Sequence, residues 1–347
     1  MRPLHHRHLR WLLWAFLPPV LLLALMSGAV FVTPAELLAA LAELFGDGPQ
    51  SRDGLILFSL RLPRVILAAL LGVVLAGCGA AMQGLFRNPL ADPSLIGVAS
   101  GASAGAGAMV VLGSGLISGG LLGVSLVAMG AFAGGFAAVL LVYRLATNST
   151  GTSVATMLLA GIAISALAGA LNSLFNVFAD NDMLRRLSLW QMGSLEGANW
   201  QRVSIVFLAA AVVCALLPRQ SQALNALLLG ESEARHLGVP VESLKRRIIL
   251  VTAFGVGIAV ATSGIVAFVG LMVPHWVRLL IGPDHRHLIP CSLLMGALFM
   301  VVADTLARVV ILPAELPTGV ITALLGAPFF VSLLIQQRHR HYAGMLP

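Results

Sequence analysis

Long apolar runs, separated by short polar segments, set the pattern along this chain. Most of the runs reach the length of about 20 residues that a helix needs to cross roughly 30 Å of hydrocarbon. They lie at residues 11–32, 65–85, 94–113, 119–143, 152–178, 203–217, 248–281, 288–312 and 317–335. The run at 248–281 is too long for one span and contains Gly264 and Gly270, so we divide it in two. The pattern predicts an all-α, polytopic membrane protein with about ten transmembrane helices, in which residues 1–347 form a single domain.

Composition supports a membrane protein. Hydrophobic residues make up 59% of the chain, charged residues make up 10%, and the mean hydropathy is +0.95. Soluble domains are nearer half apolar and about a quarter charged, so an ordinary soluble protein is excluded. The first apolar run follows a basic start, as in a signal peptide, but it continues through Val32 without a clean cleavage site. We therefore expect this run to be kept as the first helix.

Basic residues are divided unevenly between the two sides of the predicted topology. Ten spans place both termini on one side of the membrane. If that side is the cytoplasm, fourteen Lys and Arg residues lie inside and seven lie outside, which together make the chain's 21. Membrane proteins concentrate positive residues in their cytoplasmic loops, so the bias predicts cytoplasmic termini. This topology also accounts for the sequence pI of about 10.6 without any nucleic-acid partner.

One strongly polar segment follows the midpoint, at residues 229–247, "LGESEARHLGVPVESLKRR". It carries seven charged side chains in nineteen positions, and each charge at the centre of a bilayer costs about 2.5–3.5 kcal/mol. The predicted topology places the segment in the cytoplasm. Gly238 and Pro240 divide it into two short helices, 231–237 and 241–247, joined by a tight turn in which glycine can adopt a positive φ. An ordinary solvated loop is the alternative that composition leaves open.

No catalytic, metal-binding or cofactor-binding pattern emerges from the sequence. Lys245 is the only lysine and lacks the glycine pattern of a nucleotide-binding loop, so the chain has no visible means of hydrolysing ATP. The three cysteines lie in predicted spans without metal-ligand spacing. Gly101, Ser103 and Gly105 formally match a nucleophile elbow, but the required strand–turn–helix context is missing, so a hydrolase is the weakest hypothesis. Gly97, Gly101 and Gly105 instead predict a face for close helix packing in lipid.

Charged residues also occur on the predicted outer side. Arg61 and Arg64, in "RLPR", can snorkel to lipid headgroups or offer a docking point for carboxylates. Asp304 and Arg308 lie four residues apart near the outer end of a predicted helix, where they can pair. An intramembrane acid is also a functional candidate by itself. An ion-coupled secondary transporter is therefore the rival hypothesis from another class.

An outer loop and one helix face offer candidates for a substrate path. The loop after the fifth predicted span is too polar to cross the membrane, and its periodic apolar positions predict a short interfacial helix. That helix carries Arg185, Arg186 and Trp190. Asn172 and Asn176, one turn apart in the fifth span, form a polar stripe that could line a path or hold two helices together.

Five stretches together carry a resemblance to a known family. They are "RLPRVILAALLGVVLAGCGAAMQGLFRNPLADPSLIGVASGASAGA", "WQMGSLEGANW", "LGESEARHLGV", "SGIVAFVGLMVPHWVRLLIGPDHR" and "ADTLARVVILPAELPTGVITALLGAPFFVSLL". As a set they cover about residues 58 to 335 and resemble the FecCD-type permeases. These are the transmembrane subunits of ATP-binding-cassette importers for ferric siderophores, haem and cobalamin.

The resemblance implies an assembly in the inner membrane of a bacterium. The permease is expected to be a homodimer with the substrate pathway at its interface. Two cytoplasmic ATPase subunits would hold ATP and magnesium, and a periplasmic substrate-binding protein would deliver the cargo. We expect no cofactor on this chain itself, and no nucleic acid among its partners.

The same resemblance assigns roles to individual residues. Segment 230–247 resembles the family's coupling helices, which sit in a cleft on the ATPase. The matching positions are Gly230, Glu231, Ala234, Arg235, Leu237, Gly238 and Val239. Arg61, Arg64 and Arg308 match outer arginines that receive acidic residues of the binding protein.

The cargo expected from the resemblance is haem. The stretch "DNDMLRRLSLWQMGSLEGANW" most resembles the haem branch of the family. The pathway candidates are Asn172, Asn176, Arg185, Arg186 and Trp190. A ferric siderophore or cobalamin is the alternative within the same family.

Overall fold

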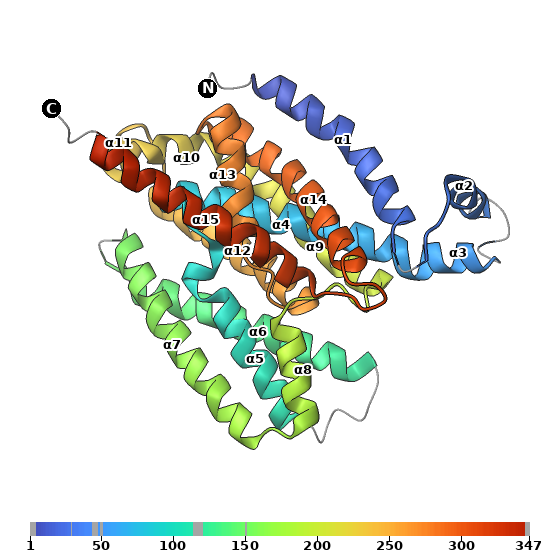
Figure 1. The fold of residues 1–347 in the computed structure, drawn as a ribbon. Helices are drawn as coiled ribbons and strands as arrows, with labels where there is room; N and C mark the ends of the chain where they lie inside the picture. The colour runs from blue at the N-terminus through green and yellow to red at the C-terminus, as the bar shows by residue number, and fades with distance from the viewer. Residues whose placement is uncertain are drawn as a thin grey trace.

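Helices form almost all of the protein, as seen in a computed structural model that describes residues 5–28, 30–43, 48, 51–113, 121–149 and 151–343. Figure 1 shows them as one elongated bundle. The α-helices are α1 (His6–Met26), α2 (Pro34–Glu43), α3 (Arg52–Ile56), α4 (Leu62–Leu85), α5 (Val98–Leu112), α6 (Leu121–Ala146), α7 (Val154–Phe178), α8 (Asn181–Gln191), α9 (Trp200–Leu216), α10 (Ser221–Leu228), α11 (Glu231–His236), α12 (Val241–Ser263), α13 (Val269–Ile281), α14 (His285–Val309) and α15 (Thr318–Ala343).

Short elements complete the chain. A π-helical turn, η1 (Leu57–Arg61), joins α3 to α4, and 3-10 turns form η2 (Pro93–Ile96) and η3 (Pro218–Gln220). The strands β1 (Thr147–Asn148) and β2 (Gly151–Thr152) pair antiparallel in a small hairpin between α6 and α7.

Helix α4 lies at the centre and packs against α9, α12, α13 and α14. Small residues let it approach its neighbours closely. A side chain at Gly72 would collide with the backbone of Gly296 in α14, and one at Gly79 would collide with the backbone of Gly270 in α13. Close backbone approach is how helices gain packing energy in lipid, where burial of apolar surface does not drive association.

Helices α5, α6, α7 and α8 form a second group, which packs on the rest mainly through α6 and α12 (Figure 1). The small-residue face predicted on α5 is confirmed at Gly101 and Gly105, which meet Gly130 and Gly134 of α6. Gly97 serves differently, because it has φ +81° and caps the start of α5.

The predicted spans are confirmed in outline and corrected at several ends. Six described helices are long and apolar enough to cross a membrane, and three shorter apolar helices accompany them. The long run at 248–281 does divide, since α12 ends at Ser263 and α13 starts at Val269. The run predicted from residue 94 starts only at Val98, because Pro93 and the left-handed Gly97 fix a 3-10 turn before it.

The polar segment is partly as predicted. The first short helix is confirmed as α11, followed by a turn in which Gly238 has φ +82°. The separate second helix predicted at 241–247 is wrong, because the backbone continues without a break from Val241 to Ser263. No glycine or proline interrupts 241–254, so nothing ends the helix where the polar residues give way to apolar ones.

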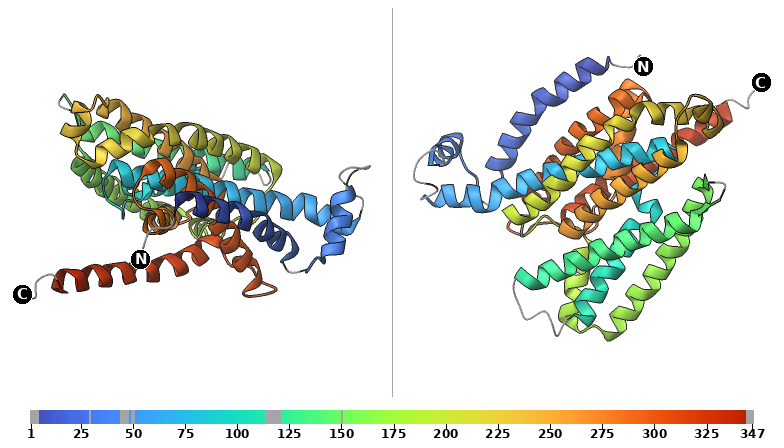
Figure 2. Two further views of the ribbon diagram at one scale, coloured as in Figure 1. Left: turned by 90° about the horizontal axis from the view of Figure 1, so that it is seen from above. Right: turned by 180° about the vertical axis from the view of Figure 1, so that it is seen from behind.

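The two ends of the bundle carry different elements (Figures 1 and 2). One end holds the start of α1, the end of α15, the helices α10 and α11, and the β1–β2 hairpin. The opposite end holds α2, α3 and the connection from α14 to α15. We name these the inner end and the outer end, after the predicted topology. Both ends of the described chain lie at the inner end, on one side as predicted.

Candidate functional site

A buried ion network lies at the inner end, where α11, α12 and the β1–β2 hairpin meet. Its centre is Lys245, whose side chain is only 1% exposed. The Lys245 Nζ atom donates to Glu231 Oε2 of α11 at 2.8 Å and to Glu242 Oε1 of α12 at 3.3 Å. It also donates to the main-chain oxygen of Thr152, in β2, at 2.6 Å. We refer to these four residues as the inner network.

The inner network holds Thr152 on both sides of its backbone. Glu242 Oε2 accepts a hydrogen bond from the Thr152 N–H at 2.8 Å, while Lys245 binds the Thr152 carbonyl. Burial would raise the pKa of Glu242, but the Thr152 N–H and the Lys245 charge outweigh it and hold this pKa below its ordinary value. Glu242 therefore stays ionised at neutral pH and keeps the network intact.

The outer surface of α11 is open to solvent. Leu237 is 64% exposed. Gly238, just after it, has no heavy atom within 4 Å of the place a side chain would occupy. Arg235 is exposed as well and pairs with Glu242 at 3.3 Å, whereas Ala234 is fully buried beneath the helix. The segment thus presents a mixed apolar and charged surface to solvent, while Ala234 and the inner network fix its buried side.

The remaining coupling candidates flank this surface. Gly230 starts α11 with φ +123°, and Val239 is half-buried after the turn. Glu231 faces the inner network from α11. The seven residues selected from the sequence therefore lie within one continuous segment, but they do not all face outward.

At the outer end, Arg61 and Arg308 both reach the last turn of α1. Arg61 is 7% exposed and donates to the Leu25 and Met26 carbonyl oxygens at 2.6 and 3.0 Å, and also to Val30. Arg308 is 4% exposed and donates to the carbonyl oxygens of Ala24 and Ser27, at 2.9 and 2.8 Å. Cations at a helix C-terminus satisfy its free carbonyls and oppose the negative end of its dipole.

The outer cluster is completed by Arg64 and two acids. Asp304, 1% exposed, lies 3.1 Å from Arg64 and 3.2 Å from Arg308, and it accepts a hydrogen bond from Thr318 Oγ1 at 3.1 Å. The predicted pair of Asp304 and Arg308 is confirmed. Arg64 also binds Glu315 at 2.6 Å. Glu315 was not selected from the sequence, because it is a lone acid in the α14–α15 connection with no spacing signal.

These contacts place a condition on the docking prediction. The guanidinium groups of Arg61 and Arg308 are buried and already bonded within the chain. Arg64 has a side chain that is 12% exposed, and its partner Glu315 is 37% exposed. Of the three arginines, Arg64 is therefore the most accessible to solvent.

The pathway candidates are spread over α7 and α8. Asn172 donates to Ser103 Oγ in α5 at 3.1 Å. This is a contact between two helices, the alternative to a role in lining a substrate path. Ser103 lies inside helix α5, so the context of a nucleophile elbow is absent there. Asn176 is exposed on the same helix. The short helix predicted in this loop is confirmed as α8, where Arg185 and Arg186 are exposed.

Helix α8 is held over the end of α5 by apolar contacts. Leu187, 3% exposed, and Met183 pack against Val110 and Val111. Trp190 is half-buried at the other end of the helix. The candidates of α7 and α8 are thus neighbours at one side of the bundle, but no described pocket joins them.

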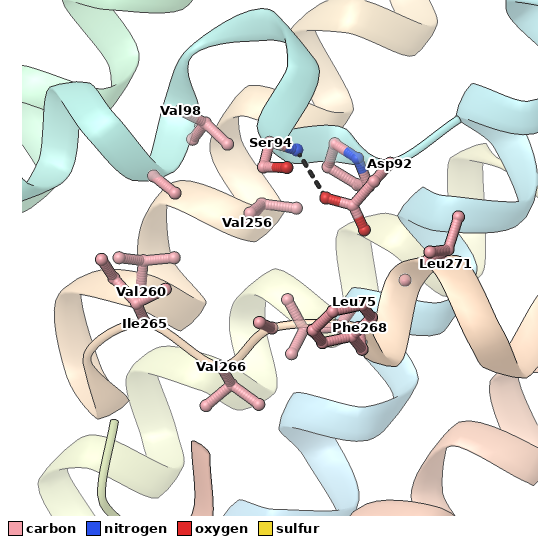
Figure 3. A pocket seen from close by; sticks show the side chains of 14 residues that line it. Leu75, Asp92, Ser94, Val98, Val256, Val260, Ile265, Val266, Phe268 and Leu271 are labelled. Carbon is pink, nitrogen blue, oxygen red and sulfur yellow. Dashed lines mark hydrogen bonds between the residues drawn. The ribbon is translucent and has the colours of Figure 1, made fainter. Parts of the chain in front are cut away.

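The described residues line a small, partly open pocket of about 200 Å³ between α4, α5, α12 and α13 (Figure 3). Its lining is apolar except for Asp92 and Ser94. Asp92 Oδ1 accepts a hydrogen bond from the Ser94 N–H at 2.8 Å, which caps η2. Pockets for small molecules usually measure about 300–1,000 Å³, so this cavity is too small for a large chelate. Among the described residues, no group of three or more His, Cys, Asp or Glu side chains could hold a metal ion.

Comparison with known proteins gives one consistent result. The model of the FecCD transport family matches residues 15–336. The hemin transport system permease protein HmuU of Yersinia pestis is 44% identical over 282 residues, which are 81% of this chain and 84% of that protein. The cobalamin import system permease protein BtuC of Halobacterium salinarum is 43% identical over 301 residues, which are 87% of this chain and 79% of that protein.

Among solved structures, a protein described as a metal-chelate type ABC transporter in an inward-facing conformation is similar over nearly its whole length. The TM-score is 0.79 and the identity is 31%, with 95% of this chain and 99% of that chain covered. The likeness therefore extends to the arrangement of the helices.

Proposed function

The chain belongs to the FecCD transport family, and from this premise we propose that it is the permease subunit of an ATP-binding-cassette importer that carries haem across a bacterial inner membrane. ATP hydrolysis would take place on a separate ATPase subunit that holds ATP and magnesium. The chain itself would supply the path, the contact with the ATPase and the contact with a periplasmic binding protein.

The proposal includes ten spans with cytoplasmic termini. Six helices meet the length and hydropathy of a span, and α5, α13 and α15 add shorter apolar helices. Helix α12 carries no charged residue from Ile248 to Ser263, which supports it as the tenth. The basic residues at the inner end support a cytoplasmic location for that end.

The observation that carries the coupling role is the exposed surface of α11. An ordinary solvated loop would need neither an alanine buried against the fold, as Ala234 is, nor an exposed leucine such as Leu237. An apolar side chain surrounded by charges, on a segment anchored by an ion network, is the composition of a protein interface. We assign this surface to the ATPase.

A second copy of the chain is proposed to cover α7. This helix leaves a broad apolar face uncovered within one protomer, and a side chain at Gly169 would meet nothing within 4 Å. The exposed apolar residues are Leu159, Ile162, Leu167, Leu171, Leu174, Val177 and Phe178. A pathway at the interface of two such faces would be mostly apolar, with Asn176 as a polar group.

Haem is favoured as cargo by the outer loop. Arg185 and Arg186 are exposed on α8, where they could meet the propionates of haem, and Trp190 lies one turn further along. Two relatives with different named cargoes, hemin and cobalamin, are almost equally similar to this chain. Identity alone therefore does not choose between them, and cobalamin is kept as the second candidate.

An ion-coupled transporter finds less support. Its mechanism would use an acid that is free to gain and lose a proton or ion within the membrane. Asp304 instead lies between Arg64 and Arg308, and Thr318 donates to it. This carboxylate is fully engaged in holding helices together.

Uptake by living cells tests the proposal. Three hosts, each unable to make one of haem, siderophores or cobalamin, would express the permease with its ATPase and binding protein. We expect growth on haem, and no growth when the nucleotide-binding lysine of the ATPase is replaced. Growth only on cobalamin or a ferric siderophore would replace haem as the cargo. Uptake that persists with the inactive ATPase but stops with an ionophore would overturn the importer itself.

A further inference from the structure

The chain's single lysine is buried where three separate elements meet. Lys245 has three N–H donors, and the structure gives it three acceptors: Glu231 of α11, Glu242 of α12 and the carbonyl of Thr152 in the hairpin. A buried ammonium is stable only when it is paired and fully hydrogen-bonded. The three elements are therefore fixed to one another at this atom.

The hairpin side of the network leads directly into α7. Thr152 is held at both its N–H and its carbonyl, by Glu242 and Lys245. The next residue, Ser153, caps α7, with its side chain accepting a hydrogen bond from the Thr156 N–H at 3.3 Å. A shift of α12 at this point would move the first turn of α7 with it.

Close packing reinforces the contact. Gly151 has φ +126°, and a side chain there would lie 2.7 Å from Glu242 Oε1. The hairpin backbone thus rests against the carboxylate, and a side chain at this position would have to displace it.

The α11 side of the network leads to the exposed surface. Glu231 is the first residue of α11, and its side chain is 32% exposed. It bonds Lys245 directly from α11, and Arg235 of the same helix adds a second link, to Glu242 at 3.3 Å. A partner that displaces α11 would therefore displace Lys245 through the Glu231 carboxylate.

We propose that Lys245 is a positioning residue that ties α11 to the base of α7, so that movement of the ATPase-bound α11 is passed to a helix of the substrate path. This rests on the proposed function, since it needs an ATPase at α11 and a path along α7. A purely structural ion pair would stabilise the hairpin in the same way but would carry no such motion.

Two substitutions separate these possibilities. Lys245→Met removes all three contacts, whereas Glu231→Gln weakens the link to α11 and leaves Lys245, Glu242 and Thr152 joined. Arg219→Met is the control, because Arg219 is exposed in η3 at the same end and makes no hydrogen bond or ion pair recorded among the described residues. Glu231 is partly exposed, so its variant is expected to fold even if Lys245→Met does not.

Hydrogen exchange in lipid nanodiscs is the first measurement. In the permease without ATPase, we expect the Thr152 amide to exchange about tenfold faster in Lys245→Met. The Thr152 carbonyl then loses its charged donor, and Glu242, which accepts from the Thr152 amide, loses the lysine that positions it. In Glu231→Gln the same amide should keep the exchange rate of the native chain. With the ATPase bound, the native hairpin and the Arg219→Met hairpin should change exchange between the nucleotide-free and ATP-bound states. The Glu231→Gln hairpin should respond clearly less, because the Arg235–Glu242 pair is the one ion pair left between α11 and the network among the described contacts.

Transport per ATP hydrolysed is the second measurement, in proteoliposomes with ATPase, binding protein and haem. We expect Glu231→Gln to transport about tenfold less cargo per ATP hydrolysed than the native complex, since a coupling contact has been lost. If Glu231→Gln transports with the native stoichiometry and its hairpin responds to nucleotide as the native hairpin does, Lys245 is a structural ion pair and the inference fails. If the native chain neither assembles with an ATPase nor transports, the proposed function fails first, whatever the variants do.

Discussion

The outer cluster and the inner network both bury charge, but they use it differently. At the outer end, Arg64 and Arg308 both pair with Asp304, and Arg308 and Arg61 bind the carbonyls that end α1. At the inner end, one lysine lies between two carboxylates that remain partly exposed, at 32% and 41%. Apart from Glu315, the charges of the outer cluster are largely buried, whereas both carboxylates of the inner network lie at a surface that a partner can reach.

This difference indicates that the outer cluster holds its helices in fixed positions, whereas the elements joined by the inner network can move. The outer arginines bond to main-chain atoms of α1, so any displacement there would break helix capping as well as ion pairs. The inner network bonds to side chains of a six-residue helix and to a two-stranded hairpin, elements with little packing of their own. Elements that move in allostery are generally drawn from such weakly packed regions.

Removal of the outer carboxylate is expected to have the largest effect. Asp304→Ala leaves Arg64 and Arg308 facing each other without their shared anion, and loss of one partner of a buried pair typically costs about 3–5 kcal/mol. Thermal unfolding in detergent should show a strongly lowered midpoint. Glu315→Gln is the matched control, because Glu315 is 37% exposed and its loss should cost under about 1 kcal/mol. Equal midpoints for the two variants would contradict the prediction that the buried pairs of Asp304 stabilise the outer end more than the exposed pair of Glu315.

Backbone strain at the inner surface should come next. Gly238 has φ +82° and nothing near it, so Gly238→Leu meets no steric clash in the free permease. It does force a side chain into the left-handed region, at about 1–2 kcal/mol, and it places that side chain on the proposed ATPase surface. We expect co-purification of the ATPase to be lost while the permease remains folded.

The matched control for that change is Gly282→Leu. Gly282 has φ +91°, caps α13, and has nothing within 4 Å. It therefore carries the same backbone strain at a place outside the segment assigned to the ATPase. If both variants lose the ATPase to the same extent, strain and not the surface of α11 is responsible.

A smaller effect is expected at the outer surface. Glu315→Gln removes the anion that now binds the exposed side of Arg64. The freed charge should raise the association rate of an acidic binding-protein surface a few-fold at low salt, and the gain should vanish at high salt. Surface plasmon resonance at two ionic strengths measures both. A rate that does not change at either salt concentration would argue against Arg64 as a docking residue.

The sequence was most informative where contacts are local. Apolar runs predicted most helices, and the four-residue spacing of Asp304 and Arg308 predicted their pair, because the helical period brings such positions together. The separate helix at 241–247 was wrong, since a change from polar to apolar residues does not end a helix without a breaker.

Contacts between distant segments could not be predicted in the same way. Arg64 and Glu315 are 251 positions apart, and Lys245 and Thr152 are 93 apart. No period in the sequence relates such residues, because only the packing of whole helices decides which of them meet. Arg61 and Arg64 therefore looked like free outer charges from the sequence, although Arg61 binds the end of α1 and Arg64 binds Asp304 and Glu315.

The smallest effect is expected at Asp284, a third charged group, which lies at the inner end outside both clusters. It caps α14 and accepts from the Arg286 N–H at 3.0 Å and from Asn225 Nδ2 of α10 at 2.6 Å. Burial opposes ionisation, but these donors and the Arg286 charge outweigh it and lower the pKa of Asp284 to about 2.

The sign of its pH dependence follows from that depressed pKa. The stabilisation is fully present above the ordinary aspartate value near 4 and is lost as the pH falls through about 2. Asp284→Asn should therefore lower the unfolding free energy by at most about 1 kcal/mol near pH 7, because the side chain is partly exposed and screened. The deficit should be constant from pH 7 down to about 5 and should shrink below about 4, which thermal unfolding across that range would measure. A deficit that grows on acidification would show that Asp284 stabilises the fold in its protonated form.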